Sequence, residues 1–281
     1  MEKKNVESGE ILLEVKNLKK YYPVRTGFIK KTELKAVDDV SFFIRKGETL
    51  GIVGESGCGK TTLGRTVLRL EEPTSGDIIY EGESIIGKNM KEYRKKMQIV
   101  FQDPYASLDP RKTVSDIIGE AMDIQKLCKT KEERRDKILE LMKLVGLNAE
   151  FYNRFPHEFS GGQRQRVMIA AAMICEPKLL IADEPTTALD VTVQAQIVKL
   201  LKRINQKKGT AILFISHDLS LVRRLCSRVI VMKDGRIVEQ GAMEDIFENP
   251  QQEYTQKLIA AIPRCVKKNS GRSAKTEEAH G

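Results

Sequence analysis

A glycine-rich stretch at residues 54–61, GESGCGKT, has the spacing G-x-x-x-x-G-K-[ST] of a loop that binds phosphate groups. Its three glycines let the backbone bend so that several N–H groups point at phosphate oxygens. Lys60 can neutralise the β- and γ-phosphates of a nucleotide, and the Thr61 hydroxyl can bind Mg²⁺. We therefore predict a nucleotide site formed by Gly54, Ser56, Gly57, Cys58, Gly59, Lys60, Thr61 and Thr62.

Two acids end a continuous apolar run at residues 178–184, KLLIADE. The run is apolar on both faces, which predicts a central strand of a parallel sheet. At the end of that strand Asp183 can bind the Mg²⁺ of a bound nucleotide, and Glu184 can activate a water beside the γ-phosphate. Two acids at a strand end are often only solvated, so this prediction depends on the phosphate loop near them.

Two further polar side chains follow predicted buried strands. Gln102 ends the run QIVFQ, and His217 follows the run AILFIS. Side chains at the carboxyl end of a strand reach the ligand crevice of an α/β sheet, so both are candidates for the same site. The alternatives are a polar strand end for the glutamine and a structural role for the histidine.

Two more segments have the chemistry of a nucleotide site. Ser160, Gly161, Gly162 and Gln163 directly precede a predicted helix, whose first N–H groups could bind a second phosphate. The alternative is that Ser160 simply caps this helix. Tyr22 could stack on an adenine ring, although a lone tyrosine is more often part of the surface or the core.

The elements that position these residues are predicted from hydrophobic periodicity and turn residues. A polar loop is expected at residues 24–35, after a first strand that ends at residues 19–23. Strands are expected at 12–18, 36–44, 49–53, 77–80, 98–104, 178–184 and 211–215, with a hairpin at 229–239. Helices are expected at 63–70, 114–122, 131–145, 164–174, 192–205, 245–248 and 254–262.

Composition limits the classes of function. The chain has 281 residues and a net charge of +9, but its basic residues are spread out, and we expect no nucleic-acid partner. No apolar run is long enough to span a membrane and the first residues are polar, so we expect a cytoplasmic protein. The five cysteines form no C-x-x-C pair, and Cys58 is either a small loop residue or a redox switch.

In this order, the segments resemble the ATP-binding subunit of ABC transporters over about residues 12 to 262. The loop at 54–61 is similar to the family's Walker A, Gln102 to its Q-loop, and SGGQ at 160–163 to its signature. The acids at 183–184 resemble Walker B, residues 188–190 the D-loop, His217 the switch histidine, and Tyr22 the adenine-stacking aromatic, with Tyr21 as the alternative. The resemblance implies an α/β fold with a RecA-like core and an N-terminal antiparallel β subdomain at 1–104 and 163–262. It also implies an inserted helical signature subdomain at 105–162, and we predict a disordered tail at 263–281.

The resemblance implies that two such subunits sandwich two ATP molecules head to tail. Glu184, His217, Lys60 and Gln102 would be catalytic, and Thr61, Gln102 and Asp183 would hold Mg²⁺. Tyr22, the phosphate loop, Gln102, Asp183, Asp190 and the signature of the facing subunit would bind ATP. The expected partners are a second ABC ATPase, which makes a heterodimer, two membrane permease subunits and, indirectly, a solute-binding protein. The subunit would lie at the cytoplasmic face of the membrane.

A narrower resemblance points to importers of peptides and nickel. It rests on the loop at 23–35, on FQDPYASLDPR at 101–111, and on DIFENP at 245–250 with the following Tyr254 and Thr255. Some members carry a C-terminal cysteine cluster for iron–sulfur, but only Cys265 lies in that region here, so no cluster is expected. Dipeptides or oligopeptides are the preferred solute, and nickel or another small solute is the alternative. A soluble ABC ATPase acting on nucleic acid or ribosomes is the alternative of a different class.

Overall fold

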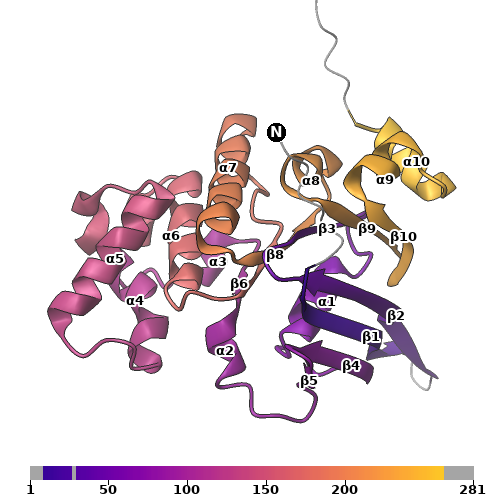
Figure 1. Cartoon of the computed structure of the whole chain (residues 1–281), viewed down its shortest axis with the longest axis horizontal. Coiled ribbons are helices and arrows are strands. Elements are labelled where there is room, and N and C mark those ends of the chain that lie inside the picture. The colour runs from indigo at the N-terminus through magenta and orange to yellow at the C-terminus, as the bar shows by residue number, and fades with distance from the viewer. Residues whose placement is uncertain (1–8, 27–29, 263–281) are drawn as a thin grey trace, which may run out of the picture.

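The computed structural model describes residues 9–26 and 30–262, which contain one antiparallel sheet, one largely parallel sheet and a group of helices (Figure 1). The antiparallel sheet has the strand order β2-β1-β4-β5. Its strands are β1 (Ile11–Thr26), β2 (Lys30–Arg45), β4 (Ser75–Tyr80) and β5 (Glu83–Ser84). The predicted tail at 263–281 lies outside the described residues.

The second sheet has the order β10-β9-β3-β8-β7-β6. Its strands are β3 (Thr49–Val53), β6 (Met97–Val100), β7 (Leu179–Asp183), β8 (Ala211–Ser216), β9 (Arg228–Lys233) and β10 (Arg236–Ala242). All neighbours are parallel except β10, which pairs antiparallel with β9. Every residue of β3, β7 and β8 is buried, as expected for strands covered on both faces. The carboxyl ends of these three strands meet at one edge, which brings the residues that follow them together.

The helices lie on both faces of this sheet and beside it (Figure 1). They are α1 (Lys60–Val67), α2 (Tyr93–Lys96), α3 (Pro104–Ser107), α4 (Val114–Ile124), α5 (Lys131–Val145), α6 (Gly161–Met173), α7 (Val191–Lys208), α8 (Leu219–Leu225), α9 (Met243–Glu248) and α10 (Glu253–Ala260). Short 3-10 turns lie at Ala149–Asn153 and Pro156–Glu158. Within the described ranges, none of these helices has the length and hydrophobicity that crossing a bilayer requires.

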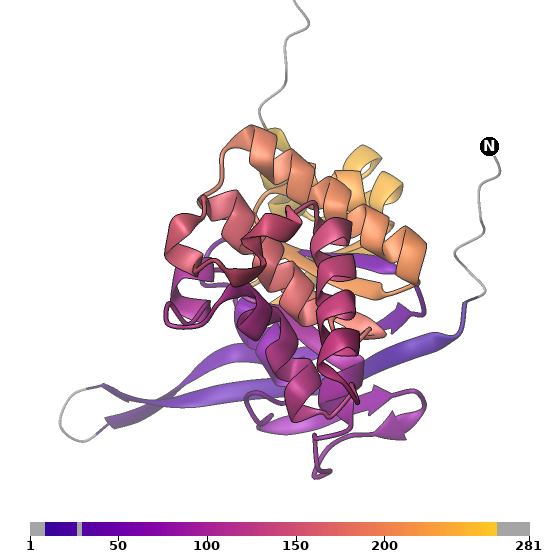
Figure 2. The ribbon, with the colours of Figure 1, turned by 90° about the vertical axis from the view of Figure 1, so that its left-hand side faces the viewer.

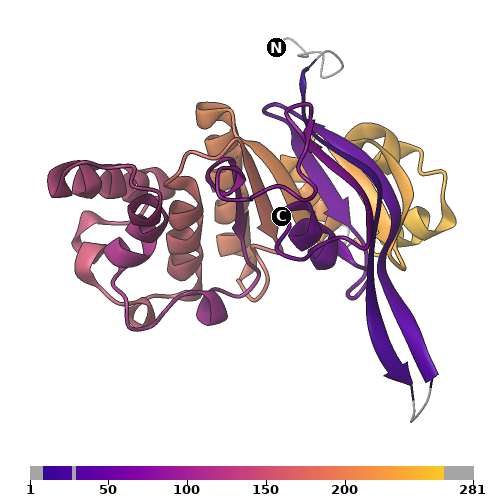
Figure 3. The ribbon, with the colours of Figure 1, turned by 90° about the horizontal axis from the view of Figure 1, so that it is seen from below.

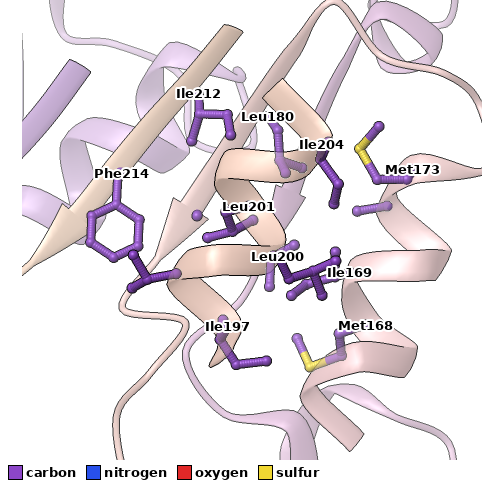
Figure 4. Close-up of a cluster of buried hydrophobic side chains, with 14 of the residues drawn as sticks. Met168, Ile169, Met173, Leu180, Ile197, Leu200, Leu201, Ile204, Ile212 and Phe214 are labelled. Atoms are coloured by element: carbon purple, nitrogen blue, oxygen red, sulfur yellow. The ribbon is translucent and has the colours of Figure 1, made fainter. Parts of the chain in front are cut away.

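Helix α7 joins the helical part of the molecule to the sheet (Figure 4). Its apolar face, formed by Ile197, Leu200, Leu201 and Ile204, is buried. On one side this face contacts Met168, Ile169 and Met173 of α6, and on the other Leu180, Ile212 and Phe214 of the sheet (Figure 4). Helices α4 and α5 pack against α6. We keep the division into a core at 1–104 and 163–262 and a helical part at 105–162 as a proposal, whose second boundary falls in the first turn of α6.

The polar stretch at 24–35 is not the loop that its composition predicted. Strand β1 continues to Thr26 and β2 begins at Lys30, so the two form a long hairpin that extends beyond the body of the molecule (Figures 2 and 3). Pairing between β1 and β4 ends at Lys19, which leaves one edge of the outer half of β1 free. Pro23 is tolerated there because a residue without an N–H can lie in an edge strand. Where side-chain exposure is described, at Val24 and residues 32–35, this stretch is exposed to water, so its polar composition reflects exposure and not the absence of a strand.

Candidate functional site

The glycine-rich loop connects β3 to α1 and is held closely by neighbouring backbone. Gly54, Gly57 and Gly59 all have positive φ angles, of 156°, 81° and 102°. A Cβ atom on Gly59 would lie 2.0 Å from the carbonyl oxygen of Ala36, and one on Gly54 would lie 2.2 Å from that of Met232. Glycine is therefore required at Gly54 and Gly59 both by the backbone conformation and by the close approach of other strands.

Lys60 lies inside the loop that precedes it. Its side chain is buried, and Nζ donates hydrogen bonds of 2.8 Å to the carbonyl oxygens of Gly54 and Glu55. The ammonium group is thus held within the loop by backbone carbonyl oxygens, which phosphate oxygens can replace as its partners. Burial raises the pKa of the neighbouring Cys58 thiol, which fits a small neutral loop residue better than a reactive thiolate.

Thr61 and Asp183 meet across the sheet edge. The Thr61 hydroxyl donates a hydrogen bond of 2.9 Å to Oδ1 of Asp183, whose side chain is almost fully buried. Burial raises the pKa of this carboxyl group, although the bond from Thr61 partly opposes the effect. A hydroxyl and a carboxylate oxygen side by side at a phosphate loop are the hard oxygen ligands that Mg²⁺ prefers, so the residues fit this ion.

Three side chains converge on one carboxylate oxygen of Glu184. Thr187 Oγ1 donates a hydrogen bond of 2.9 Å to Oε2, Gln102 Nε2 donates one of 3.2 Å, and His217 Nδ1 lies 3.2 Å away. These residues follow β6, β7 and β8, so the edge formed by neighbouring parallel strands positions them. Glu184 has a left-handed backbone, with a φ angle of 45°, and its N–H donates to Ile215. This backbone conformation turns the chain sharply after β7 and directs the carboxylate into the group.

Thr187 was not among the residues predicted from the sequence. Thr187 is the third residue after Glu184 in the sequence EPTT at 184–187. The short spacing between the carboxylate and this hydroxyl is the signal that could have revealed it. A hydroxyl so placed can hold the carboxylate in one orientation while leaving its other oxygen available.

A cavity of about 420 Å³ lies beside the loop and is lined by half of the predicted site residues. These are Tyr22 of β1, Ser56, Gly57 and Gly59 of the phosphate loop, Lys60, Thr61 and Thr62 of α1, Gln102 and Glu184. Residues 34–36 of β2 and Asp234 with Gly235 of the β9–β10 turn complete the lining, while Gly54 and His217 line another cavity, of about 530 Å³. Tyr22 lines this cavity and its hydroxyl donates to Glu71, whereas Tyr21 is not part of the lining and its hydroxyl donates to Asp38. The geometry favours Tyr22 over Tyr21 as the aromatic contact of a base.

The signature residues and Asp190 lie elsewhere, at the N-termini of α6 and α7. Ser160 caps α6: its backbone N–H donates a bond of 2.9 Å to the Gln163 side chain, and its hydroxyl accepts one of 3.4 Å from the Gln163 N–H. Asp190 caps α7 by accepting a bond of 2.9 Å from the Val193 N–H. The two helix starts adjoin, since a Cβ atom on Gly162 would lie 2.5 Å from Val193 Cγ1. Ser160, Gly161, Gly162, Gln163 and Asp190 are absent from the lining of the 420 Å³ cavity.

Comparison with known proteins agrees with this geometry. Residues 37–187 match the model of the family described as "ABC transporter", and residues 238–280 match that of "Oligopeptide/dipeptide transporter, C-terminal region". The oligopeptide transport ATP-binding protein OppF of Bacillus subtilis is 52% identical over 258 residues, which cover 90% of this chain and 83% of that protein. The dipeptide transport ATP-binding protein DppF of Haemophilus influenzae is 49% identical over 263 residues, covering 92% of this chain and 80% of the relative.

Solved structures of ATP-binding cassettes also match this chain. A dimeric post-hydrolysis state of the ATP-binding cassette MJ0796, bound to ADP and Pi, superposes with a TM-score of 0.73 at 30% identity and covers 83% of this chain and 99% of that one. The cbiO1 subunit of the cbiONQ ABC transporter complex of Clostridium perfringens has a TM-score of 0.73 at 29% identity, covering 90% of this chain and 96% of its own.

Proposed function

The chain belongs to the ABC transporter family, and from this premise we propose that it hydrolyses ATP to drive the import of dipeptides or oligopeptides. The observation that most supports the hydrolytic part is the convergence of Gln102, Thr187 and His217 on Glu184 beside the phosphate loop. The match of residues 238–280 to the oligopeptide/dipeptide transporter region supports the solute.

ATP would occupy the 420 Å³ cavity with its base against Tyr22 and its phosphates in the glycine loop. Lys60 would exchange its carbonyl partners for the β- and γ-phosphate oxygens, and the N-terminus of α1 would add its partial positive charge. Thr61, Asp183 and Gln102 would hold Mg²⁺, which neutralises charge on the β- and γ-phosphates when bound. The hydrogen bond between Thr61 and Asp183 keeps these ligands together before nucleotide arrives.

Glu184 would orient the attacking water and accept its proton. Its Oε2 is engaged by Gln102 and Thr187, so its other oxygen is the one that would face the water. His217 lies on the same side and would contact the γ-phosphate, which fixes the position of the phosphorus relative to the water. The site therefore acts mainly by positioning groups and by balancing charge.

A second cassette would complete the site. In this chain Ser160 at the start of α6 is exposed, and none of the signature residues lines the cavity beside the chain's own phosphate loop. A head-to-tail partner would bring its own signature serine and glycines to the γ-phosphate, and the solved cassette MJ0796, which is dimeric, supports the pairing of two cassettes. ATP would then favour the closed dimer, and hydrolysis would remove that preference.

The remaining partners follow from the family. ABC transporters contain membrane permease components, and we propose that two such subunits receive the motion of this chain at the cytoplasmic face of the membrane. A second, related ATPase would form the other half of the dimer, and an external solute-binding protein would deliver the peptide.

The proposal is tested by affinity purification of this subunit from detergent-solubilised membranes of its own host. We expect two multi-span proteins and a second ATPase to co-purify, and any associated binding protein identifies the solute as peptide or nickel. Recovery of the subunit alone, or with ribosomes or DNA, would contradict the transporter role.

A further inference from the structure

A buried carboxylate, Asp38 of β2, joins this strand to β1 and β10 beside the cavity. The Tyr21 hydroxyl of β1 donates a hydrogen bond to Asp38 of β2. Arg236 of β10 donates two more to Asp38 Oδ2, of 2.9 Å from Nε and 2.6 Å from Nη2. Lys35 Nζ lies 3.8 Å from the same oxygen. Asp38 is only 4% exposed, so the carboxylate is shielded from water and enclosed by donors.

The protonation states suit these bonds. The bond to Asp38 raises the pKa of Tyr21 to about 12, and the bonds from Tyr21 and Arg236 lower the pKa of Asp38. At neutral pH Tyr21 therefore keeps its proton and Asp38 its charge, so the donors and the acceptor persist across the physiological range.

The hydrogen bonds among Tyr21, Asp38 and Arg236 connect three parts of the cavity wall. Tyr22 follows Tyr21 directly, Lys35 also lines the cavity, and Asp234 and Gly235 directly precede Arg236. The backbone continues the connection, because the Asp38 N–H donates a bond of 2.8 Å to the Gly235 carbonyl.

From Gly235 the connection reaches the phosphate loop. The Gly235 N–H donates a bond of 3.0 Å to the carbonyl of Cys58. A Cβ atom on Gly235 would lie 2.6 Å from the carbonyl oxygen of Lys35, so the turn and β2 are in close contact. Movement of Asp38 or Arg236 would thus displace the wall that faces a bound base.

We propose that Tyr21, Asp38 and Arg236 are positioning residues that set the nucleobase end of the ATP site. Successive side chains of a strand point to opposite faces, so fixing the Tyr21 phenol on one face fixes the orientation of Tyr22 on the other. The hydrogen bonds from Arg236 to Asp38 hold the β9–β10 turn at a fixed distance from β2. This inference rests on the proposed stacking of adenine on Tyr22.

The test compares a ligand that has a base with one that lacks it. Dissociation constants for ATP and for inorganic tripolyphosphate, each with Mg²⁺, are measured by calorimetry on the full-length chain. Tyr22→Ala removes the proposed stack and should weaken ATP binding about tenfold, because stacking of a base on an aromatic ring is worth about that much or more. Its affinity for tripolyphosphate should stay within about twofold.

The positioning residues are tested with Tyr21→Phe, Arg236→Gln and Asp38→Asn. Each should weaken ATP binding by about threefold or more, as a part of the stacking contribution, with tripolyphosphate unchanged. Arg236 is 64% exposed at its side chain, so Arg236→Gln gives a result even where Asp38→Asn fails to fold. Lys16→Gln, which breaks an exposed ion pair with Glu14 on the same strand, is the control and should change neither constant.

The affinity measurements distinguish the proposed stacking on Tyr22 from the proposed positioning role of Tyr21, Asp38 and Arg236. If Tyr22→Ala changes the ratio of the two constants and the Tyr21 and Arg236 variants do not, the positioning role is wrong and the proposed site stands. Equal losses for ATP and tripolyphosphate in those variants show a general structural role and also overturn the inference. If Tyr22→Ala itself leaves the ratio unchanged, the proposed stacking fails and the inference falls with it.

Discussion

Thr61 and Asp183 are separated by 122 residues in the chain, yet the hydroxyl of one donates a 2.9 Å hydrogen bond to the carboxylate of the other. The bond connects the start of α1 to the end of β7, the two elements that carry the phosphate loop and the acidic strand end. The two side chains therefore lie close enough together to bind one ion, which fits the proposed Mg²⁺ site. This preorganisation has a cost, since Asp183 is a buried carboxylate whose pKa is raised by burial.

Asp183→Asn should separate stability from function. The amide keeps an acceptor for Thr61 and removes a buried charge, so without nucleotide we expect the free energy of unfolding to rise by about 1 kcal/mol. ATP hydrolysis should fall by about 100-fold or more, because Mg²⁺ loses a charged ligand. Urea unfolding and a steady-state phosphate assay measure the two effects. A variant less stable than the parent would show that the charge of Asp183 is stabilised in the nucleotide-free protein.

Glu184→Gln should bind ATP and lose most of its turnover. The amide has the size of the carboxylate but cannot accept the proton of water, so we expect a fall of about 10²–10³-fold in kcat. The ATP-bound form should accumulate as a closed dimer, visible by light scattering after gel filtration. Glu176→Gln, in an exposed pair with Lys208, is the matched control and should behave as the parent does. Turnover at the parent rate in Glu184→Gln would assign the base elsewhere.

Lys60→Ala should act on binding. It removes the charge that neutralises phosphates and leaves the Gly54 and Glu55 carbonyls without their donor, so ATP affinity should fall about 100-fold. Fluorescent-nucleotide titration measures the loss, and Lys202→Ala, at an exposed position of α7, serves as the control. An unchanged dissociation constant would disprove the role of the loop.

His217→Ala should act on the chemical step. The histidine lies 3.2 Å from the Glu184 carboxylate and outside the loop that holds the phosphates, so affinity should change by less than about threefold. The maximal rate should fall by about 10²-fold, because His217 no longer fixes the γ-phosphate relative to the attacking water. A rise in KM with an unchanged kcat would mean that His217 only binds ATP.

The central part of the fold could be predicted from the sequence because its signals are strong. Thr49–Val53 and Ala211–Ser216 are runs that are buried on both faces, and chemically active residues follow such strands directly. On α5 the buried residues Ile138, Leu141, Met142 and Val145 recur at the spacing of one helix face, which is the pattern that predicts this helix.

Other parts carried no comparable signal. Helices α2 and α3 have four residues each, too few to show a period. In the outer half of the β1–β2 hairpin Val24 and residues 32–35 are exposed to water, so the polar sequence there resembles a loop. Asp38 is one of two adjacent acids in the strand sequence AVDDVSF, and only the fold brings Tyr21 and Arg236 to it.

The most direct test of the proposed function is transport in proteoliposomes that contain the purified complex of this subunit and its partners, with ATP on the side of the ATPases. We expect uptake of a labelled peptide delivered by the binding protein, loss of uptake with Glu184→Gln, and no uptake of Ni²⁺. Peptide uptake that persists with Glu184→Gln would contradict the proposal that hydrolysis by this chain drives transport. ATP-dependent uptake of Ni²⁺ in place of peptide would contradict the proposed solute.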